Sequence, residues 1–309
     1  GAELRARDRD RLPPLVVRGA ALRPVTVALE VASAQVASAV LLAALATAGT
    51  TTVSLPGPAR DHTERMLASL GAPIEVESLP GGGRRVSLAG PFRPAGFRAR
   101  VPGDLSAAAF PLAAAAAVPG ARVTAIGVGL NPTRTGFLDA IVALGVGVAR
   151  ANERIEAGEP VGDVTVTGPA ALRACDIPAE WVPRLIDEVP AWAVVAACAR
   201  GRSTLAGASE LRVKESDRLA ALARNLTALG VRVEEHPDGL AIEGGPVSGG
   251  RVAAHGDHRI AMAFAVLGTL ARGPVEIDDA GAIDTSFPGF AATLAALGAR
   301  IGASGEGSA

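Results

Sequence analysis

The sequence has few of the residues that mark several classes of protein. Aromatic residues make up 3% of its 309 residues and tyrosine is absent, so a buried core must consist mainly of Ala, Val and Leu. Cys175 and Cys198 are the only cysteines, which favours neither a disulfide framework nor a zinc site and fits a reducing cytoplasm. The longest apolar stretch, residues 36–47, is too short and too rich in alanine to span a bilayer.

The chain also lacks a large net charge of either sign. The formal net charge is −1, which argues against nucleic acid or an anionic membrane as the main partner. Hydrophobic residues make up 49% of the chain and there are 37 glycines, a composition typical of a well-buried globular protein with many turns. The length is sufficient for two domains.

A Leu-Gly phrase followed by a strand-forming run recurs four times along the chain. We expect each glycine of the phrase to end a helix in the left-handed conformation and to lead into a strand. A recurrence of this kind predicts a fold of repeated supersecondary units. The glycines of the phrase are Gly71, Gly145, Gly230 and Gly298.

The segments between these glycines share one order of elements. Two short strand-like runs come first, as at residues 85–88 and 97–101, and an Ala-rich helix follows them. A Gly-led strand, a polar loop and a second helix complete the unit, so the fold class is α/β. The Ala-rich helices are expected at residues 33–47, 106–118, 187–199 and 257–271, and the Gly-led strands at 49–53, 120–123, 201–205 and 273–277.

The two ends of the chain also follow from the repeat. Residues 1–4 resemble residues 71–74 without the preceding leucine, which predicts that the chain begins inside a unit of a longer protein. Residues 302–309 form a Gly/Ser tail that is expected to be disordered.

The most charged stretch comprises residues 212–218, where five of seven side chains are charged. Ser216 or a near neighbour is expected to cap the helix that follows, whose free N–H groups, with Lys214 and Arg218, could bind a phosphate or carboxylate. The alternative is a solvated helix start with a Glu215–Arg218 pair, and this stretch alone favours neither. The apolar face of the helix is formed by Leu219, Leu222, Leu226 and Leu229.

Cations recur at the expected helix starts of several units. Helix capping explains the Ser, Thr and Asp residues there, but a cation at a helix N-terminus opposes the helix dipole. These cations are therefore explained best if several helix starts converge on a polyanionic ligand. They are Arg60, Arg134, Lys214, Arg218 and Arg259.

Eight blocks spread over nearly the whole chain resemble, in the same order, those of the 5-enolpyruvylshikimate-3-phosphate (EPSP) synthase family. That family transfers the enolpyruvyl group of phosphoenolpyruvate (PEP) to the 5-hydroxyl of shikimate 3-phosphate, on the route to chorismate and the aromatic amino acids. The resemblance implies two globular halves of βαβαββ units (an inside-out α/β barrel), a cytoplasmic monomer, no metal or other cofactor, and glyphosate as a possible inhibitor. The blocks are residues 33–35, 60–64, 102–104, 131–134, 186–188, 212–218, 257–259 and 285–288.

The resemblance also implies roles for individual residues around PEP. Glu215 corresponds to the acid/base at the methylene carbon, and Asp187 to the group that contacts the substrate hydroxyls, including the attacking one. Lys214 resembles the lysine between the two substrates. Arg218 and Arg259 resemble the PEP-binding arginines.

Residues on the shikimate 3-phosphate side are implied in the same way. Ser33, Ala34 and Gln35 resemble the loop that binds this substrate, and Gln35 would touch both ligands. Arg60 resembles an arginine near it in the glyphosate-tolerant class of the family.

Purely structural alternatives exist for several of these residues. Ser33, Asp187 and Asp257 could serve only as helix caps. His62 and His258 are assigned no role. Glu188, next to Asp187, could simply face solvent.

The chain departs from the family pattern at a few positions. Ala107 stands where a second serine is common, and Phe110 stands where some members have a tyrosine. Thr285 stands where some members have a lysine near PEP, in a Thr-Ser-Phe-Pro form that resembles the glyphosate-tolerant class.

The family's N-terminal blocks find no match in the chain. Residues 1–131 are therefore expected to form an incomplete shikimate-3-phosphate-binding half, and residues 132–309 the PEP-binding, catalytic half.

Two rival interpretations remain at the level of sequence. UDP-N-acetylglucosamine enolpyruvyl transferase shares the fold, but residues 33–35 and 214–218 favour EPSP synthase. A truncated, non-catalytic remnant is the other possibility. The intact set of Asp187, Lys214, Glu215, Arg218 and Arg259 indicates that the gene encoded a working enzyme.

Overall fold

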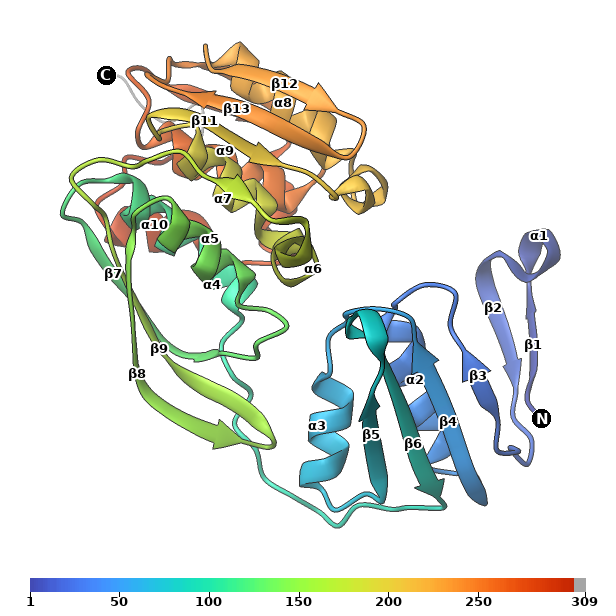
Figure 1. Cartoon of the computed structure of the whole chain (residues 1–309). Coiled ribbons are helices and arrows are strands. Elements are labelled where there is room, and N and C mark those ends of the chain that lie inside the picture. The colour runs from blue at the N-terminus through green and yellow to red at the C-terminus, as the bar shows by residue number, and fades with distance from the viewer. Residues whose placement is uncertain (303–309) are drawn as a thin grey trace. The chain divides into compact units, whose positions relative to one another are not determined.

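The computed structural model describes residues 1–302 and divides the chain into two compact units (Figure 1). The first unit comprises residues 1–101 and 155–159, and the second comprises residues 102–154 and those from 160 onward. Except for Gly302, the tail that was expected to be disordered (residues 302–309) lies outside the described residues. Within the described residues, no helix combines the length and the apolar character needed to cross a membrane.

The division between the units lies about thirty residues before the boundary expected near residue 131. The reason is helix α4 (Leu105–Ala117), which packs against α7 (Val189–Ala196) and α9 (His258–Gly268) of the second unit. Because α7 and α9 bury α4, this helix belongs to the hydrophobic core of the second unit. It does so although it precedes residue 131, where the boundary was expected.

The first unit contains one complete copy of the repeat. Strand β3 pairs with β4 in parallel, and the other pairs of the sheet are antiparallel, in the order β3-β4-β6-β5. Helices α2 and α3 contribute to its core. An antiparallel hairpin of β1 (Glu3–Ala6) and β2 (Leu12–Arg18), joined by α1 (Arg7–Asp10), precedes this copy. The elements of the copy are β3 (Thr26–Ala28), α2 (Ala34–Ala44), β4 (Gly49–Leu55), α3 (His62–Ser69), β5 (Ile74–Ser78) and β6 (Arg84–Gly90).

The second unit contains two further copies of this strand arrangement and part of a third. The sheets run β7-β9-β8 and β10-β11-β13-β12, and β14 pairs in parallel with β15. A parallel bridge from Gly103 to Val128 takes the place of the first strand in the earliest of them. The remaining elements are β7 (Arg122–Gly129), α5 (Gly136–Ala143), β8 (Gly147–Glu156), β9 (Glu159–Thr167), β10 (Asp176–Ile177), α6 (Val182–Leu185), β11 (Gly201–Leu205), α8 (Arg218–Ala228), β12 (Arg232–His236), β13 (Gly239–Gly244), β14 (Gly250–Ala253), β15 (Val275–Asp278) and α10 (Phe290–Ala296).

The Leu-Gly phrases end helices as predicted. Gly71, Gly145, Gly230 and Gly298 have φ angles of 80°, 93°, 85° and 99°, the left-handed region that a side chain would disfavour. The predicted α/β repeat is therefore confirmed. The Ala-rich helices and the Gly-led strands also lie within a few residues of their expected bounds.

The prediction of a strand at residues 97–101 is wrong, because these residues, all of them described, form no strand in the structure. Phe97 is 56% exposed and Val101 is 87% exposed, so neither side chain has a core to cover. A run of strand-forming residues without a pairing partner and a buried face does not form a strand.

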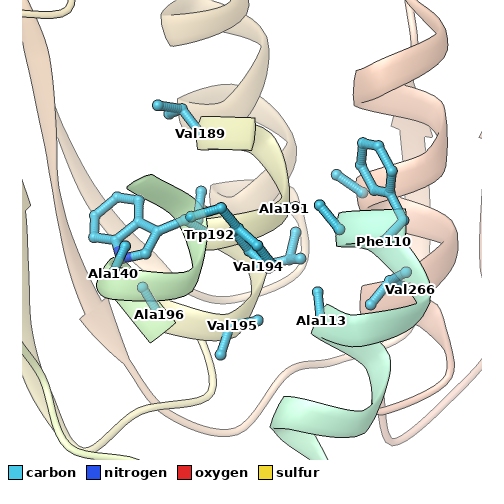
Figure 2. Packing of buried hydrophobic residues seen from close by; sticks show 14 of the residues in the cluster. Phe110, Ala113, Ala140, Val189, Ala191, Trp192, Val194, Val195, Ala196 and Val266 are labelled. Atoms are coloured by element: carbon cyan, nitrogen blue, oxygen red, sulfur yellow. The ribbon is translucent and has the colours of Figure 1, made fainter. Parts of the chain in front are cut away.

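Helices rather than sheets fill the centre of the second unit (Figure 1). Helices α4, α7 and α9 are buried on nearly all sides, and small side chains let them approach one another closely. Figure 2 shows Trp192 of α7 beside Ala140 of α5, while Ala191 and Val194 of α7 lie on the side toward Ala113 of α4. The N-terminal ends of α4, α7 and α9 lie close together, because Ser106 donates a hydrogen bond to Glu188 and Arg259 donates one to the carbonyl of Asp187.

Candidate active site

Two aspartates cap the helix starts that carry the predicted site residues. Asp257 accepts hydrogen bonds from the N–H groups of Arg259 (2.9 Å) and Ile260 (3.5 Å) at the start of α9. Asp217 accepts one from Ala220 (3.0 Å) at the start of α8. The cap expected at Ser216 or a near neighbour is therefore Asp217.

Arg218 lies at the centre of the site and is fully buried. Its Nε donates to Asp257 Oδ2 at 2.8 Å, and its Nη2 donates to Glu215 Oε2 at 2.6 Å. Its Nη1 lies 3.8 Å from Asp187 Oδ1, and within the described chain this buried nitrogen has no hydrogen-bond partner. Buried N–H groups normally have a partner, so this nitrogen is suited to an oxygen atom of a ligand or a water molecule.

Asp257 is the permanent counter-ion of Arg218. Burial alone would raise the pKa of Asp257, but the bond and charge of Arg218, together with the bonds from Arg259 N–H and Ser216, lower it overall. The carboxylate therefore stays ionised, and it serves both the start of α9 and the guanidinium of Arg218.

Arg259 joins the same group through the backbone. Its Nη1 donates to the carbonyl oxygen of Asp187 at 2.9 Å. Asp187 lies in the 3-10 turn η3 (Ile186–Glu188), which leads into α7. We call Asp187, Glu215, Arg218, Asp257 and Arg259 the Arg218 cluster.

Lys214, which was expected to help bind an anionic ligand, is paired with a carboxylate of the chain itself. Its ammonium group forms an ion pair with Glu210 in the 3-10 turn η4 (Ser209–Val213). Arg212 binds Asp217, Glu235 and the carbonyl of Pro237, which fastens this stretch to the β12–β13 hairpin. The structure thus unites four of the five predicted residues of the second unit, and it places the Lys214 ammonium beside Glu210.

Glu188 was missed by the sequence reasoning, and the suggestion that it faces solvent is wrong. It is 1% exposed, and it accepts a hydrogen bond from the Ser106 hydroxyl. Its Oε1 lies 3.8 Å from Arg259 Nη1 and 4.0 Å from Arg134 Nη2. The cations at positions 134 and 259 were the only signal in the sequence that a buried carboxylate lay nearby.

His62 and His258, which were assigned no role, both lie beside charged neighbours. His62 Nδ1 lies 2.7 Å from Glu159 Oε1. Burial and the adjacent Arg259 lower the pKa of His258, so its imidazole is neutral at neutral pH.

The predicted shikimate 3-phosphate residues belong to the first unit. Ser33 caps α2 by accepting a hydrogen bond from the N–H of Val36 at 3.3 Å, as its structural alternative required. Ala34 is half-buried and Gln35 is exposed. The backbone carbonyl of Arg60 accepts a bond of 2.6 Å from Arg84.

A family model and two curated relatives of similar sequence point to the same enzyme family. The model of the family described as EPSP synthase (3-phosphoshikimate 1-carboxyvinyltransferase) matches residues 1–294. A 3-phosphoshikimate 1-carboxyvinyltransferase from Anaeromyxobacter sp. (strain Fw109-5) is 54% identical over 299 residues, which are 96% of this chain and 68% of the relative. One of the same name from Gloeobacter violaceus is 49% identical over 296 residues, or 96% of this chain and 67% of the relative.

Solved structures agree with the sequence relatives. An EPSP synthase from Acinetobacter baumannii superimposes with a TM-score of 0.88 at 39% identity, over 96% of this chain and 68% of that one. The enolpyruvyl transferase NikO from Streptomyces tendae, at 19% identity and a TM-score of 0.71 over 97% of this chain and 69% of that one, supports the fold alone. These matches confirm the enolpyruvyl transferase fold and the family expected from the motifs. The chain belongs to the EPSP synthase family.

Proposed function

We propose that this chain carries the activity of its family: transfer of the enolpyruvyl group from PEP to the 5-hydroxyl of shikimate 3-phosphate, with release of phosphate. One observation carries the proposal. In a relative of curated synthases, a fully buried arginine has an N–H group without a hydrogen-bond partner in the described chain. This group lies 3.8 Å from the carboxylate of Asp187, whose backbone carbonyl accepts a hydrogen bond from a second arginine, Arg259. Such a site can bind a small polyanion.

The chemistry needs two proton transfers, and the cluster offers two carboxylates for them. Addition to PEP protonates its methylene carbon and removes the proton of the attacking hydroxyl. Glu215 is half exposed and held by Arg218, so we assign it the methylene proton. Asp187 is assigned the contacts with the substrate hydroxyls.

Anion binding is assigned to the cations around these carboxylates. Arg218 and Arg259 would bind PEP, and Lys214 would leave Glu210 to reach between the two substrates. In the first unit, Ser33, Ala34, Gln35 and Arg60 are assigned to shikimate 3-phosphate. We further infer a cytoplasmic monomer. We assign it to the glyphosate-tolerant class because residues 285–288 have the form typical of that class.

The test is an assay of phosphate release by the purified chain. We expect release with PEP and shikimate 3-phosphate together, and none with PEP alone. UDP-N-acetylglucosamine in place of shikimate 3-phosphate is the control acceptor. Release with the control acceptor alone would contradict the proposal. Binding of PEP without release under either condition would indicate a non-catalytic remnant.

A further inference from the structure

Glu188 is a buried carboxylate that the assigned chemistry does not use. Its Oε1 accepts the hydrogen bond of Ser106 and lies at ion-pair distance from Arg259 (3.8 Å) and Arg134 (4.0 Å). Arg134 in turn contacts the Ser106 hydroxyl and lies 3.3 Å from Asp104 Oδ1. Removing a carboxylate from water this completely is costly unless its neighbours compensate.

The charged and polar side chains around Glu188 come from several elements of the second unit. Helix α4 supplies Ser106 and its capping residue Asp104, the loop before α5 supplies Arg134, and α9 supplies Arg259. The turn η3 itself adds Asp187. Helix α7 carries no charged residue, and the one charged side chain of α6, Arg184, pairs with Asp139 at 2.7 Å.

The two fully buried carboxylates beside the cluster arginines therefore differ. Asp257 has its pKa lowered, chiefly by Arg218 acting against burial, and stays ionised. Burial raises the pKa of Glu188, and Asp187 adds to the effect, although Ser106, Arg134 and Arg259 oppose it. Of the two, Glu188 is the carboxylate whose charge depends on whether Arg259 remains available to it.

We propose that Glu188 is a positioning residue that acts as the counter-ion of Arg259 in the free chain and takes up one proton from solvent when an anion binds at Arg259. The bond formed is O–H on a carboxylate oxygen of Glu188, and a solvent or buffer species gives up the proton. The proposal rests on the proposed function only for the identity of the anion, PEP. Its physical basis is that an anion on Arg259 would otherwise leave two negative groups sharing one guanidinium away from water.

The test is titration calorimetry of the full chain with PEP and, separately, with inorganic phosphate. Each is measured in buffers of low and high ionisation enthalpy, from mildly acidic to neutral pH, because the difference gives the number of protons taken up. We expect more uptake by the native chain than by Glu188→Gln. The same difference should persist in a His258→Gln background, which removes the neighbouring imidazole as its source.

Ser106→Ala provides a second variant that retains the carboxylate. Loss of a hydrogen bond to the ionised form should move the curve of proton uptake against pH to higher pH. If Glu188→Gln does not fold, this shift decides the matter, and an unmoved curve would overturn the proposal. Equal proton uptake by the native chain and Glu188→Gln would also overturn it.

Failure of the proposed function would look different. Phosphate binding with Glu188-dependent proton uptake, but without tighter binding of PEP, would refute the assignment of PEP and support the role of Glu188. Binding of neither anion would overturn both.

Discussion

Glu215 and Arg218 are joined by a hydrogen bond of 2.6 Å, yet their side chains are 50% and 1% exposed. This contrast separates their roles, since an exposed carboxylate can reach a substrate and a buried guanidinium is fixed in place. Replacing Glu215 by Gln keeps the shape but removes the titratable proton. We expect turnover to fall by roughly 100-fold or more, with a smaller change in PEP affinity. Steady-state kinetics of the catalytically competent enzyme would measure both, and near-normal turnover with a raised PEP Michaelis constant would mean that Glu215 only positions its neighbours.

Arg218→Ala should weaken PEP binding and also destabilise the fold. The substitution leaves Asp257 buried without its main cation, which typically costs about 3–5 kcal/mol. Asp257→Asn in the same chain removes the orphaned charge and keeps an oxygen for capping α9. We expect the double variant to recover much of the unfolding free energy but not the binding of PEP. Urea unfolding and calorimetry with PEP separate the two effects, and recovery of both would contradict the role of Arg218 in binding.

The raised pKa of Glu188 predicts the sign of a pH effect on stability. In the unfolded chain Glu188 has its ordinary pKa of 4.5. In the folded chain burial raises this pKa, so the carboxyl group keeps its proton to higher pH. Glu188 therefore favours the folded state at low pH, and this contribution is lost as pH rises from 4.5 through the folded-state pKa. Relative to Glu188→Gln, the native chain should lose unfolding free energy across that window. Parallel pH profiles for the two proteins would contradict the prediction.

At the scale of elements, Arg84 of β6 fastens the loop that precedes α3. It donates to the carbonyls of Ala59 (2.7 Å) and Arg60 (2.6 Å) and to Glu64 (2.8 Å), all with little exposure to solvent. Arg84→Lys cannot reproduce three bonds from one planar fork. We expect Arg84→Ala to cost about 3–5 kcal/mol of stability, because Glu64 is left buried and unpaired.

Hydrogen exchange would show where that stability is lost. Residues 57–62 should exchange faster in Arg84→Ala, and Arg84→Lys should rescue them only in part. Arg85→Ala is a matched control, because Arg85 is the next residue of the same strand and its pair with Glu77 is exposed. That control should change stability by less than about 1 kcal/mol. Equal effects of the two alanine variants would show that the fastening is unimportant.

The sequence predicted those features whose cause is local. A helix end at Gly230 needs only a residue that tolerates a positive φ, and a cap at Asp257 needs only a short acceptor before the helix. Both signals lie within a few residues of the feature. The same holds for the α/β repeat, which follows from short patterns in order.

The features that the sequence did not reveal depend on distant partners. Glu188 is buried by Ser106, a residue 82 positions away, so no neighbour in sequence indicated its environment. The Lys214–Glu210 pair is an exception, because its partners are only four residues apart in sequence. The unit boundary depends on where α4 packs, which only the tertiary core decides.

At the scale of the whole molecule, each unit has a core of its own. Leu41 and Leu88 belong to the core of the first unit, and Leu222 and Trp192 belong to that of the second. Trp181 and Trp192 both lie in the second unit, and the chain has no tyrosine. Tryptophan fluorescence therefore reports unfolding of the second unit alone.

We expect denaturant unfolding to occur in two steps. Circular dichroism should detect both, while tryptophan fluorescence should follow only that of the second unit. Leu41→Ala should lower the denaturant midpoint for unfolding of the first unit, which tryptophan fluorescence does not detect. The decrease should correspond to about 2–5 kcal/mol of unfolding free energy. Leu222→Ala is the matched variant for the other step. Coincident transitions by both probes in all three proteins would contradict independent cores.

The alanine-rich helices at the centre of the second unit have a thermodynamic consequence. Alanine loses no side-chain rotamer freedom on burial, so ordering α4 and α7 has a low entropic cost per residue. Each alanine also removes little apolar area from water, and the heat-capacity change of unfolding follows that area. The second unit should therefore have a smaller heat-capacity increment per residue than a core of leucine and phenylalanine would give. Its free energy of unfolding would then vary gently with temperature, and cold would weaken it less than most proteins of its size.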